Sequence, residues 1–288
     1  MTNKSCVITG ANAGLGYATA LALAKKGATV YLICRSTERG RMAQRSIVEE
    51  SENEAVYLIQ ADLSSQRDLR TAAEEISAST TKVDVLINNA AMVASSRQTN
   101  KDGVEKQFAV NHLAYFLLTH LLMPQLQQAP DARIINVGSA NHFRGKMHFD
   151  DLFLEKSYNP LRAYNQTKLA NLLFTYELDR RLKTEGLSNI SVNCADPGLN
   201  NTQIGVKHTN WFHKLLWNIR RRQGQSPHEG AQCQIYLASA PEVSEESGKY
   251  WYQSKAVPSS DLSYNQKDAQ RLWEISATLC QIEDFFAS

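Results

Sequence analysis

The sequence predicts an α/β fold, a doubly wound and mostly parallel sheet with helices on both faces. Short β-branched runs alternate with longer helical patterns through the first two thirds of the chain, which is typical of βαβ units. A glycine-rich turn joins the first run to the first helical pattern. Because no linker rich in glycine, serine or proline interrupts residues 1–288, we expect one domain with a substrate-covering insertion at about 200–224.

Each element follows from its own residue pattern. Apolar, β-branched runs predict strands at residues 5–9, 29–34, 56–60, 83–87, 133–137 and 190–194, with a further short strand near 249–252. Apolar residues at helical spacing predict helices at residues 15–26, 37–50, 66–79, 103–128, 163–185, 227–238 and 265–279.

The composition excludes several classes of protein. The chain has 31 basic and 29 acidic side chains, a net charge of +2, and 43% hydrophobic residues, which argues against intrinsic disorder and against nucleic-acid binding. The five cysteines form no CxxC pair and the seven histidines form no HExxH pattern, so we expect no metal site and a reducing, cytoplasmic compartment. No run is long and apolar enough for a signal peptide or a membrane span.

The turn at residues 9–16, TGANAGLG, follows the first predicted strand and opens the first predicted helix. Glycines there allow positive φ and close approach of a diphosphate, while the helix N-terminus offers free N–H groups. A glycine trio alone is often only a turn, but the strand before it and the helix after it favour a dinucleotide site. The residues predicted to bind the cofactor here are Gly10, Asn12, Gly14, Leu15 and Gly16.

The second predicted strand ends in Arg35 and Ser36, where a dinucleotide fold that binds NAD has a carboxylate. Arg35 and Ser36, with help from Arg39 or Arg41, can hold a 2′-phosphate through charge-assisted hydrogen bonds. The sequence therefore favours NADP(H) over NAD(H). The alternative is that these arginines are simply solvated at the start of a helix.

Two later strand ends carry further candidate cofactor-binding residues. Asp62 and Leu63 follow the third strand, where the carboxylate either meets the adenine amino group or caps a helix. Asn89, Ala90 and Ala91 follow the fourth strand, where small side chains allow the cofactor to approach and an asparagine satisfies exposed backbone groups. A plain polar turn is the other interpretation of that segment.

Tyr164 and Lys168 are four residues apart in a helical segment, so both project from one face. A nearby ammonium favours phenolate over phenol, which suits the tyrosine to acid–base catalysis. On an arbitrary helix the same pair would be solvated. Ser139, at the end of the fifth strand, and Asn111, in the long preceding helix, are the residues that turn this pair into a candidate catalytic group.

These motifs together resemble the short-chain dehydrogenase/reductase family, which has a Rossmann fold. The resemblance is carried by TGANAGLG at 9–16, NNAA at 88–91, Asn111 in FAVNHLAYF, Ser139 in NVGSA, the Tyr164–Lys168 pair and Pro197-Gly198. Residues 144–152, residues 167–171 with LLFTYEL, and SGKY at 247–250 resemble the retinol dehydrogenase-like branch.

The resemblance implies a role for each catalytic residue. Tyr164 would be the general acid/base, Ser139 would orient the carbonyl and stabilise alkoxide charge, and Asn111 would hold a water in a proton relay. Lys168 would bind the nicotinamide-ribose hydroxyls and lower the pKa of the tyrosine. Pro197, Gly198 and Thr202 would contact the nicotinamide end of the cofactor.

The sequence departs from the family pattern at three places. Gly138 stands where relatives commonly have a second serine. Asp196 stands where the branch frequently has histidine, and the approach to Thr202 is more polar than usual. These last two differences put a purely retinoid substrate in doubt.

Residues 211–222 combine an apolar helical stripe containing two tryptophans with three consecutive arginines. The stripe either packs on the core, or covers a lipophilic substrate, or makes a peripheral membrane contact.

The leading interpretation is an NADP(H)-dependent oxidoreductase, acting as a carbonyl reductase or alcohol dehydrogenase. Its substrate would be a small lipophilic aldehyde, ketone or alcohol of the retinal/retinol kind. A light-dependent protochlorophyllide reductase-like enzyme and a non-catalytic NADP-sensing regulator are the alternatives. The long helices at 103–128 and 163–185 either form a homodimer face or are covered by other parts of the chain.

Overall fold

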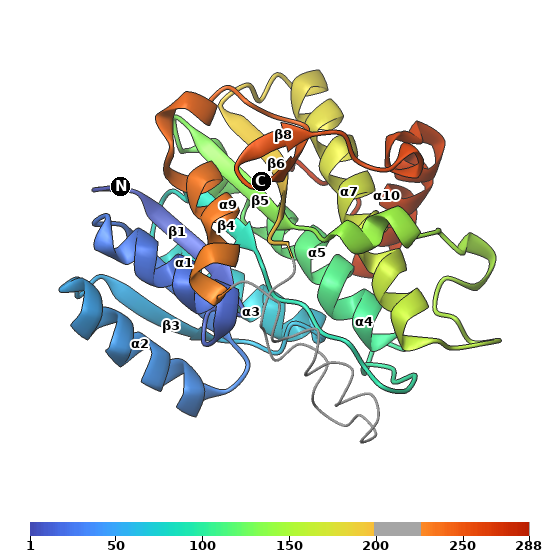
Figure 1. The fold of residues 1–288 in the computed structure, drawn as a ribbon, viewed down its shortest axis with the longest axis horizontal. Coiled ribbons are helices and arrows are strands. Elements are labelled where there is room, and N and C mark those ends of the chain that lie inside the picture. Colours follow the sequence, from blue (N-terminus) through green and yellow to red (C-terminus); the bar gives the residue numbers. More distant parts are fainter. Residues whose placement is uncertain (199–225, 288) are drawn as a thin grey trace.

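Strands from along the whole chain assemble into one eight-stranded sheet in the order β3-β2-β1-β4-β5-β6-β7-β8 (Figure 1). The computed structural model describes residues 1–198 and 226–287. Neighbouring strands from β3 to β7 are parallel, and β8 is antiparallel to β7. Because β2 and β4 lie on opposite sides of β1, the strand order reverses there, and the predicted doubly wound fold is confirmed.

The predicted strands agree with the observed ones to within two residues at each end. They are β1 (Ser5–Thr9), β2 (Thr29–Cys34), β3 (Val56–Gln60), β4 (Val85–Asn88), β5 (Ala132–Val137), β6 (Ile190–Asp196), β7 (Lys249–Tyr252) and β8 (Lys255–Val257). The long helices are α1 (Gly14–Lys25), α2 (Thr37–Ser51), α3 (Gln66–Ser79), α7 (Pro160–Thr184), α9 (Pro227–Ser239) and α10 (Gln266–Cys280).

Two hydrophobic cores lie on the two faces of the sheet. Side chains alternate along each strand, so Cys6 and Ile8 of β1 face one core while Val7 between them faces the other. The Cys6 and Ile8 side packs against α1, α2 and α9. The Val7 side packs against α3, α7 and α10. Helices therefore cover both faces, as the continuous apolar strands predict.

The predicted single helix at residues 103–128 is wrong in detail. The segment divides into α4 (Lys106–Phe108), the π-helical turn η1 (Ala109–Leu113), α5 (Ala114–Leu121) and α6 (Met123–Gln127). Pro124 lies in the first turn of α6, and because proline has no N–H it cannot continue the hydrogen bonding of α5. The π-helical turn contains Asn111, and π-helical turns often mark functional sites.

Strand β8 was not predicted from the sequence. It pairs with β7 through a two-residue turn in which Gln253 and Ser254 both have positive φ, 50° and 58°. Tight hairpins need this conformation, and they usually obtain it with Asn-Gly or Asp-Gly. The Gln-Ser pair gives no such signal.

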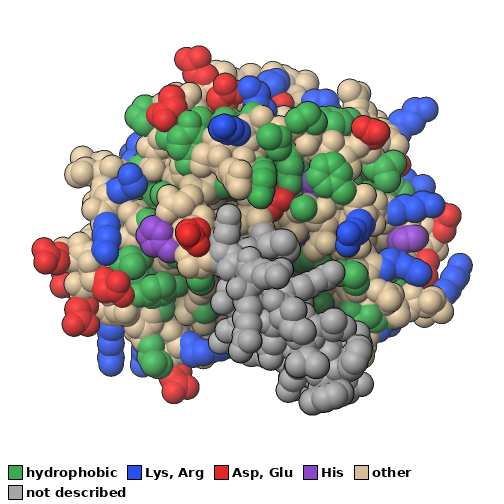
Figure 2. Space-filling model, viewed as in Figure 1, with side chains coloured by type: hydrophobic (Ala, Val, Ile, Leu, Met, Phe, Trp, Pro, Cys, Tyr) green, Lys and Arg blue, Asp and Glu red, His purple; other side chains and the backbone are tan. Residues whose placement is uncertain are grey.

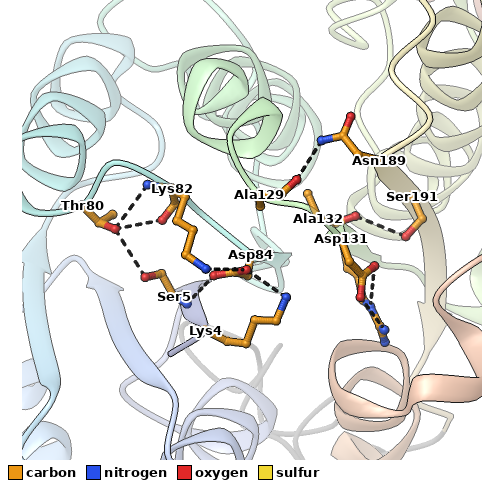
Figure 3. A network of polar contacts seen from close by, with 11 residues as sticks. Lys4, Ser5, Thr80, Lys82, Asp84, Ala129, Asp131, Ala132, Asn189 and Ser191 are labelled. Atoms are coloured by element: carbon orange, nitrogen blue, oxygen red, sulfur yellow. Dashed lines mark hydrogen bonds and ion pairs between the residues drawn. The ribbon is translucent and has the colours of Figure 1, made fainter. Parts of the chain in front are cut away.

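A polar network ties the amino-terminal ends of the strands together (Figure 3). The buried carboxylate of Asp84 contacts Lys4 Nζ at 2.9 Å and Lys82 Nζ at 3.2 Å, and accepts the backbone N–H of Ser5 at 2.9 Å. Arg133 of β5 pairs with Asp131 at 2.9 Å and donates to the carbonyl of Ala240 at 2.7 Å, just after α9. These contacts lie at the amino-terminal ends of the parallel strands, whereas the predicted cofactor-binding residues lie at the carboxyl ends.

Helix α10 packs along α7 and completes the core on the Val7 side of the sheet (Figure 1). Trp273 of α10 meets Phe116 and Phe174 with ring centroids 5.0 and 5.9 Å apart, and Phe285 beyond α10 meets the same two rings. Lys and Arg side chains are interspersed with Asp and Glu over the face seen in Figure 2. No helix in the described part of the chain is both long enough and apolar enough to cross a membrane.

Candidate active site

The turn between β1 and α1 brings backbone segments too close together for most side chains. Gly10 and Gly14 have φ of +67° and +58°, a region that favours glycine. A Cβ on Gly16 would lie 2.5 Å from the carbonyl oxygen of Gly10, so any side chain there would push the helix away from the turn. The three predicted glycines thus each have a steric reason to be glycine.

Helix α1 begins without a side-chain cap. Ala13 stands at its N-cap position and the first turn has no acidic residue. By contrast, the N-termini of α2, α3, α9 and α10 are each capped by a serine or asparagine side chain. The first N–H groups of α1 are therefore available to an anion, which fits the diphosphate of a dinucleotide. The Leu15 side chain packs against α9, so the part of Leu15 that can bind the anion is its backbone N–H.

The end of β4 is fastened to the end of β1. Thr9 Oγ1 accepts the backbone N–H groups of Asn89 at 2.9 Å and Ala90 at 3.0 Å, and Asn89 Nδ2 donates to the carbonyl of Thr9 at 2.8 Å. A Cβ on Gly10 would lie 3.0 Å from the Cβ of Ala90, so the turn and the Asn89–Ala90 segment are in contact. Thr9 is a site-building residue that the motif contained but sequence reasoning did not single out.

Two strand ends carry the residues predicted for the adenosine half. Arg35 is exposed directly after β2, and Ser36 caps α2 by accepting the N–H of Arg39 at 3.4 Å. Asp62 follows β3, but it is not the cap of α3, because Ser65 occupies that position. One oxygen of Asp62 accepts both the backbone N–H and the hydroxyl of Ser64, at 2.9 and 2.8 Å.

Asn111 is held in the π-helical turn by backbone groups of another segment. Its Oδ1 accepts the N–H of Met92 at 2.8 Å, and its Nδ2 donates to the carbonyl of Met92 at 2.9 Å and to Thr167 Oγ1 at 3.2 Å. The first two bonds bring η1 against the segment after β4, and the third brings it against α7. Tyr115, one turn later, adds a bond from its hydroxyl to the carbonyl of Ala90 at 3.0 Å.

Lys168 is buried, with 1% of its surface exposed, and its Nζ donates to the carbonyl of Val137 at 2.8 Å. An ammonium has three donors, so two remain for ribose hydroxyls. Burial lowers the pKa of this lysine from 10.5 to about 8, while the nearby Cys194 and Asp196 act in the opposite direction. Tyr164 lies one turn earlier, with its ring centroid 5.6 Å from Lys168 Nζ.

Ser139 caps the short 3-10 helix η2 (Ala140–Arg144), accepting the N–H of Asn141 at 3.3 Å. Its carbonyl faces His142 Nδ1 at 2.8 Å, and His142 Nε2 faces the backbone N–H of Ser260 at 3.1 Å. Because Ser260 N–H can only donate, the two contacts together define the tautomer with hydrogen on Nδ1. His142 therefore ties the segment of Ser139 to the loop after β8.

Burial, a carboxylate and a serine all act on the hydroxyl of Tyr164. Burial raises the pKa of its hydroxyl to about 12, the carboxylate of Asp196 raises it further, and a hydrogen bond with Ser139 lowers it. Tyr250 and His142 are neighbours of the site that sequence reasoning did not assign to it, and Asp196 was noted there only as a departure from the pattern of the branch.

One signal could have pointed to Asp196. It is an acidic residue at the carboxyl end of a parallel strand, directly before Pro197-Gly198, and such strand ends form the ligand-binding edge. Gly198 has φ of +72° and donates its N–H to Asp196 Oδ1 at 2.8 Å. Thr202 and the stripe at 211–222 lie outside the described residues.

Gly138 has a steric explanation. A Cβ there would lie 2.6 Å from Cys194 Sγ, and 3.8 Å from the ring of Tyr250. The side chains of β6 and β7 thus fill the space that a serine would need. All five cysteines, including Cys194, are buried free thiols. Residues 1–198 and 226–287 contain no group of three or more His, Cys, Asp or Glu able to hold a metal ion.

The strand ends and α7 bring Ser139, Tyr164, Lys168 and Asn111 together at the edge where the glycine turn lies. The residues present fit a nicotinamide dinucleotide, because the turn leaves no room for a Cβ and the helix after it is uncapped. Such a site can bind a dinucleotide along the strand ends and transfer a proton at its far end.

Known proteins are similar to this chain in sequence and in fold. A model of the short chain dehydrogenase family matches residues 4–212. Retinol dehydrogenase 12 of Mus musculus is 38% identical over 280 residues, which cover 97% of this chain and 87% of the relative. An uncharacterized protein of Mycobacterium paratuberculosis has a solved structure with a TM-score of 0.77 and 33% identity, covering 98% of this chain and 95% of its own.

A short-chain dehydrogenase from Shigella flexneri 2a, solved in complex with NADP, has a TM-score of 0.70 and 19% identity, covering 88% of this chain and 98% of its own. At that identity the likeness concerns the fold. The family model spans most of the chain, and the mouse relative spans nearly all of it. The protein therefore belongs to the short-chain dehydrogenase family, in its retinol dehydrogenase-like branch, and is an oxidoreductase of the kind that uses a nicotinamide cofactor.

Proposed function

We propose that the protein catalyses hydride transfer between NADP(H) and the carbonyl or alcohol carbon of a small lipophilic substrate of the retinal/retinol kind. The observation that carries the proposal is the meeting of Tyr164, Lys168 and Ser139 around the carboxyl ends of β5 and β6. Lys168 bonds the end of β5, and Ser139 interacts directly with Tyr164. This arrangement suits proton transfer to an oxygen that is held between a serine and a tyrosine.

The cofactor, when bound, supplies or accepts the hydride. Ser139 donates a hydrogen bond to the substrate oxygen and stabilises the negative charge that grows on it during reduction. Tyr164 gives its proton to that oxygen, and in the oxidative direction takes the proton back. Lys168 uses its two remaining donors to hold ribose hydroxyls, and Asn111 holds a water through which a proton reaches the site.

The preference for NADP(H) is supported by Arg35, an exposed cation directly after β2, where the adenosine half of a dinucleotide lies in this fold. No carboxylate occupies that strand end to receive a ribose 2′-hydroxyl. The lipophilic substrate class is supported by the 38% sequence identity with retinol dehydrogenase 12 of Mus musculus.

The proposal is tested by measuring NADPH oxidation with aldehydes, ketones, retinal and steroids, with NADH as the control cofactor. We expect turnover with at least one lipophilic carbonyl compound and a lower KM for NADPH than for NADH. No turnover with any substrate and either cofactor would contradict the proposal and favour a regulator that only senses the dinucleotide.

Tyr164→Phe should keep NADPH binding and lose most turnover, because the variant retains the ring but has no proton to give. We expect kcat to fall by roughly 100-fold to 10,000-fold, with the Kd for NADPH, measured by fluorescence titration, unchanged. Tyr252→Phe, which alters a tyrosine 39% exposed on β7, is the matched control and should retain full activity. Substantial turnover by a clean preparation of Tyr164→Phe would refute the role.

A further inference from the structure

His142 is a buried side chain of η2, with 0% of its surface exposed, and both of its ring nitrogens contact backbone groups. Nδ1 donates to the carbonyl of Ser139 at 2.8 Å, and Nε2 accepts the backbone N–H of Ser260 at 3.1 Å. The ring of Tyr250 packs against the imidazole with centroids 4.8 Å apart. Because a neutral imidazole has one donor and one acceptor, both are used, and turning the ring would leave a buried N–H without its acceptor.

Ser139 lies where the chain leaves the sheet. Gly138, directly before it, still bonds to β6, because its N–H donates to the carbonyl of Ala195 at 2.8 Å. The carbonyl of Ser139 instead accepts two donors of His142, the backbone N–H at 3.0 Å and ring Nδ1 at 2.8 Å. The backbone bond stays within the short turn of η2. The ring, through its second nitrogen, links Ser139 to a segment outside that turn.

The segment that receives this link, the loop at 258–264, is fastened to α7. Ser259 Oγ lies 2.6 Å from the hydroxyl of Tyr176, and the backbone N–H of Ser259 donates to the hydroxyl of Tyr264 at 3.0 Å. The rings of Tyr176 and Tyr264 are stacked, with centroids 5.2 Å apart and planes 7° apart. Tyr176 belongs to α7, so the loop is held by the helix that carries the candidate acid/base.

The two ends of η2 meet α7 in different ways. At the far end Gly145 packs directly on the helix, where a Cβ would lie 2.6 Å from the carbonyl oxygen of Asn165. At the near end the His142 side chain adds a connection from Ser139 to the loop that α7 holds. Because Tyr164 is a residue of the same rigid helix, a contact that fixes Ser139 relative to α7 also fixes it relative to Tyr164. Their separation matters, since both act on one substrate oxygen in the proposed reaction.

We propose that His142 is a positioning residue, a bridge that holds Ser139 in place relative to Tyr164 by joining it to the loop at 258–264. This inference rests on the proposed function. Both ring nitrogens are used in the bridge, so His142 acts through Ser139 and transfers no proton itself. A bridge fails when either end is lost, and this distinguishes it from a local bond at Ser139 and from packing alone.

The first test reads the bridge in the wild-type protein without turnover. Histidine labelled with nitrogen-15 gives separate signals for the two ring nitrogens, and those of His142 are assigned through the bonds of the ring to its own backbone. At neutral pH we expect a protonated Nδ1 and an unprotonated Nε2, because Nε2 has to accept the N–H of Ser260. A ring with its hydrogen on Nε2, or with both nitrogens protonated, overturns the proposal without any variant.

Three variants then break the bridge at different places. The amide nitrogen of asparagine is as many bonds from Cβ as Nδ1 of histidine, so His142→Asn keeps a donor for Ser139 and loses the acceptor for Ser260. The amide oxygen of glutamine is as many bonds from Cβ as Nε2, so His142→Gln keeps the acceptor and loses the donor. His142→Leu loses both and keeps an apolar side chain against Tyr250.

We expect kcat to fall by a similar factor, roughly 10-fold to 100-fold, in all three variants, because a displaced serine stabilises alkoxide charge poorly. The KM for NADPH should change less than twofold, since the glycine turn and the strand ends that face the adenosine half are unaltered. His120→Leu is the matched control. His120 Nδ1 lies 2.9 Å from the carbonyl of Phe285, so this variant should lower stability in urea titrations and keep the wild-type kcat.

The other outcomes overturn the proposal, each for its own reason. Wild-type kcat in His142→Asn or His142→Gln would show that one bond is enough, and wild-type kcat in His142→Leu alone would assign the effect to packing on Tyr250. A KM for NADPH that rises as kcat falls, or an equal loss of kcat in His120→Leu, would reduce the effect to general loosening of the fold. A wild-type protein with the expected ring form but no turnover would refute the proposed function and this inference with it. Turnover that survives all three substitutions would refute only the role of His142.

Discussion

At the scale of single residues, Lys168 shows how burial decides chemistry in this site. Its folded-state pKa of about 8 lies below the value of 10.5 for a free lysine. The buried ammonium therefore destabilises the folded protein fully below about pH 8, and this cost disappears as the pH rises toward 10.5. We expect cofactor affinity to weaken above about pH 8, because the lysine then loses the charge that holds the ribose.

Arg35 is the residue on which cofactor choice depends. Arg35→Asp replaces a cation by an anion at the end of β2, which should repel a 2′-phosphate and accept a ribose 2′-hydroxyl. We expect the ratio of the KM for NADPH to the KM for NADH to rise by roughly tenfold or more. Arg45→Asp makes the same charge change at an exposed position of α2 and should leave the ratio nearly constant. Equal ratios in Arg35→Asp and the wild type would refute the assignment of Arg35 to the 2′-phosphate.

Gly138 tests whether the space next to Ser139 is truly filled. Gly138→Ala would bring a Cβ within 2.6 Å of Cys194 Sγ, so we expect the free energy of unfolding to fall by about 1–3 kcal/mol in urea titrations. The double variant Gly138→Ala/Cys194→Ala removes the clashing sulfur and should recover most of that loss. Additive losses in the double variant would show that some other contact is responsible.

At the scale of elements, the carboxyl ends and the amino-terminal ends of the parallel strands have different roles. At the carboxyl ends of the strands, α1 begins uncapped, so its first N–H groups are left for a ligand, and η1 forms the π-helical turn that contains Asn111. At the amino-terminal ends, Asp84 and Arg133 link neighbouring strands and the end of α9. We therefore expect a substitution at the amino-terminal ends of the strands to change the stability of the fold without changing ligand binding.

Asp84→Ala tests this separation at the amino-terminal edge. The variant leaves the buried N–H of Ser5 without its acceptor and Lys4 without its partner, so we expect unfolding to become about 2 kcal/mol easier. NADPH affinity, measured by fluorescence titration, should stay within twofold of wild type. Lys82→Ala removes only a partly exposed partner and should cost less than about 1 kcal/mol. A large loss of NADPH affinity in Asp84→Ala would show that the two edges are coupled.

At the scale of the whole molecule, residues near the end of the chain pack on one face of the long helices. The sequence left open whether the segments at 103–128 and 163–185 meet a second copy or are covered otherwise. Helix α10 and Phe285 lie on them, with aromatic rings from α5, α7, α10 and the last residues forming one cluster. Those ring faces are buried within a single chain.

Phe285→Ala should therefore weaken the whole fold. The ring is 5% exposed and meets Phe116 at 4.9 Å and Trp273 at 4.5 Å between centroids. We expect the free energy of unfolding to fall by about 3 kcal/mol, because truncation leaves a cavity among rings that cannot collapse into it. Phe286→Ala, at a partly exposed ring, is the control and should cost clearly less. Equal losses from the two variants would show that this cavity is not the cause.

Particular patterns in the sequence were enough for much of this molecule. Each parallel strand is an apolar run bounded by turns, and burial on both faces leaves such a run little choice but a central strand. The glycines at 10, 14 and 16 are likewise readable, because positive φ and a forbidden Cβ leave no other residue type. The pairing of Tyr164 with Lys168 depends only on helical spacing.

Other features depend on contacts between segments far apart in the sequence. The π-helical turn at Asn111 is fixed by Met92 and Thr167, and β8 depends on a turn whose residues have no strong preference for positive φ. The hydrogen bond between Asp196 and Tyr250 arises only when β6 pairs with β7. The sequence by itself determined which side chains are available for chemistry. Their mutual electrostatics were decided by tertiary structure, because burial and neighbouring charge are properties of the folded site.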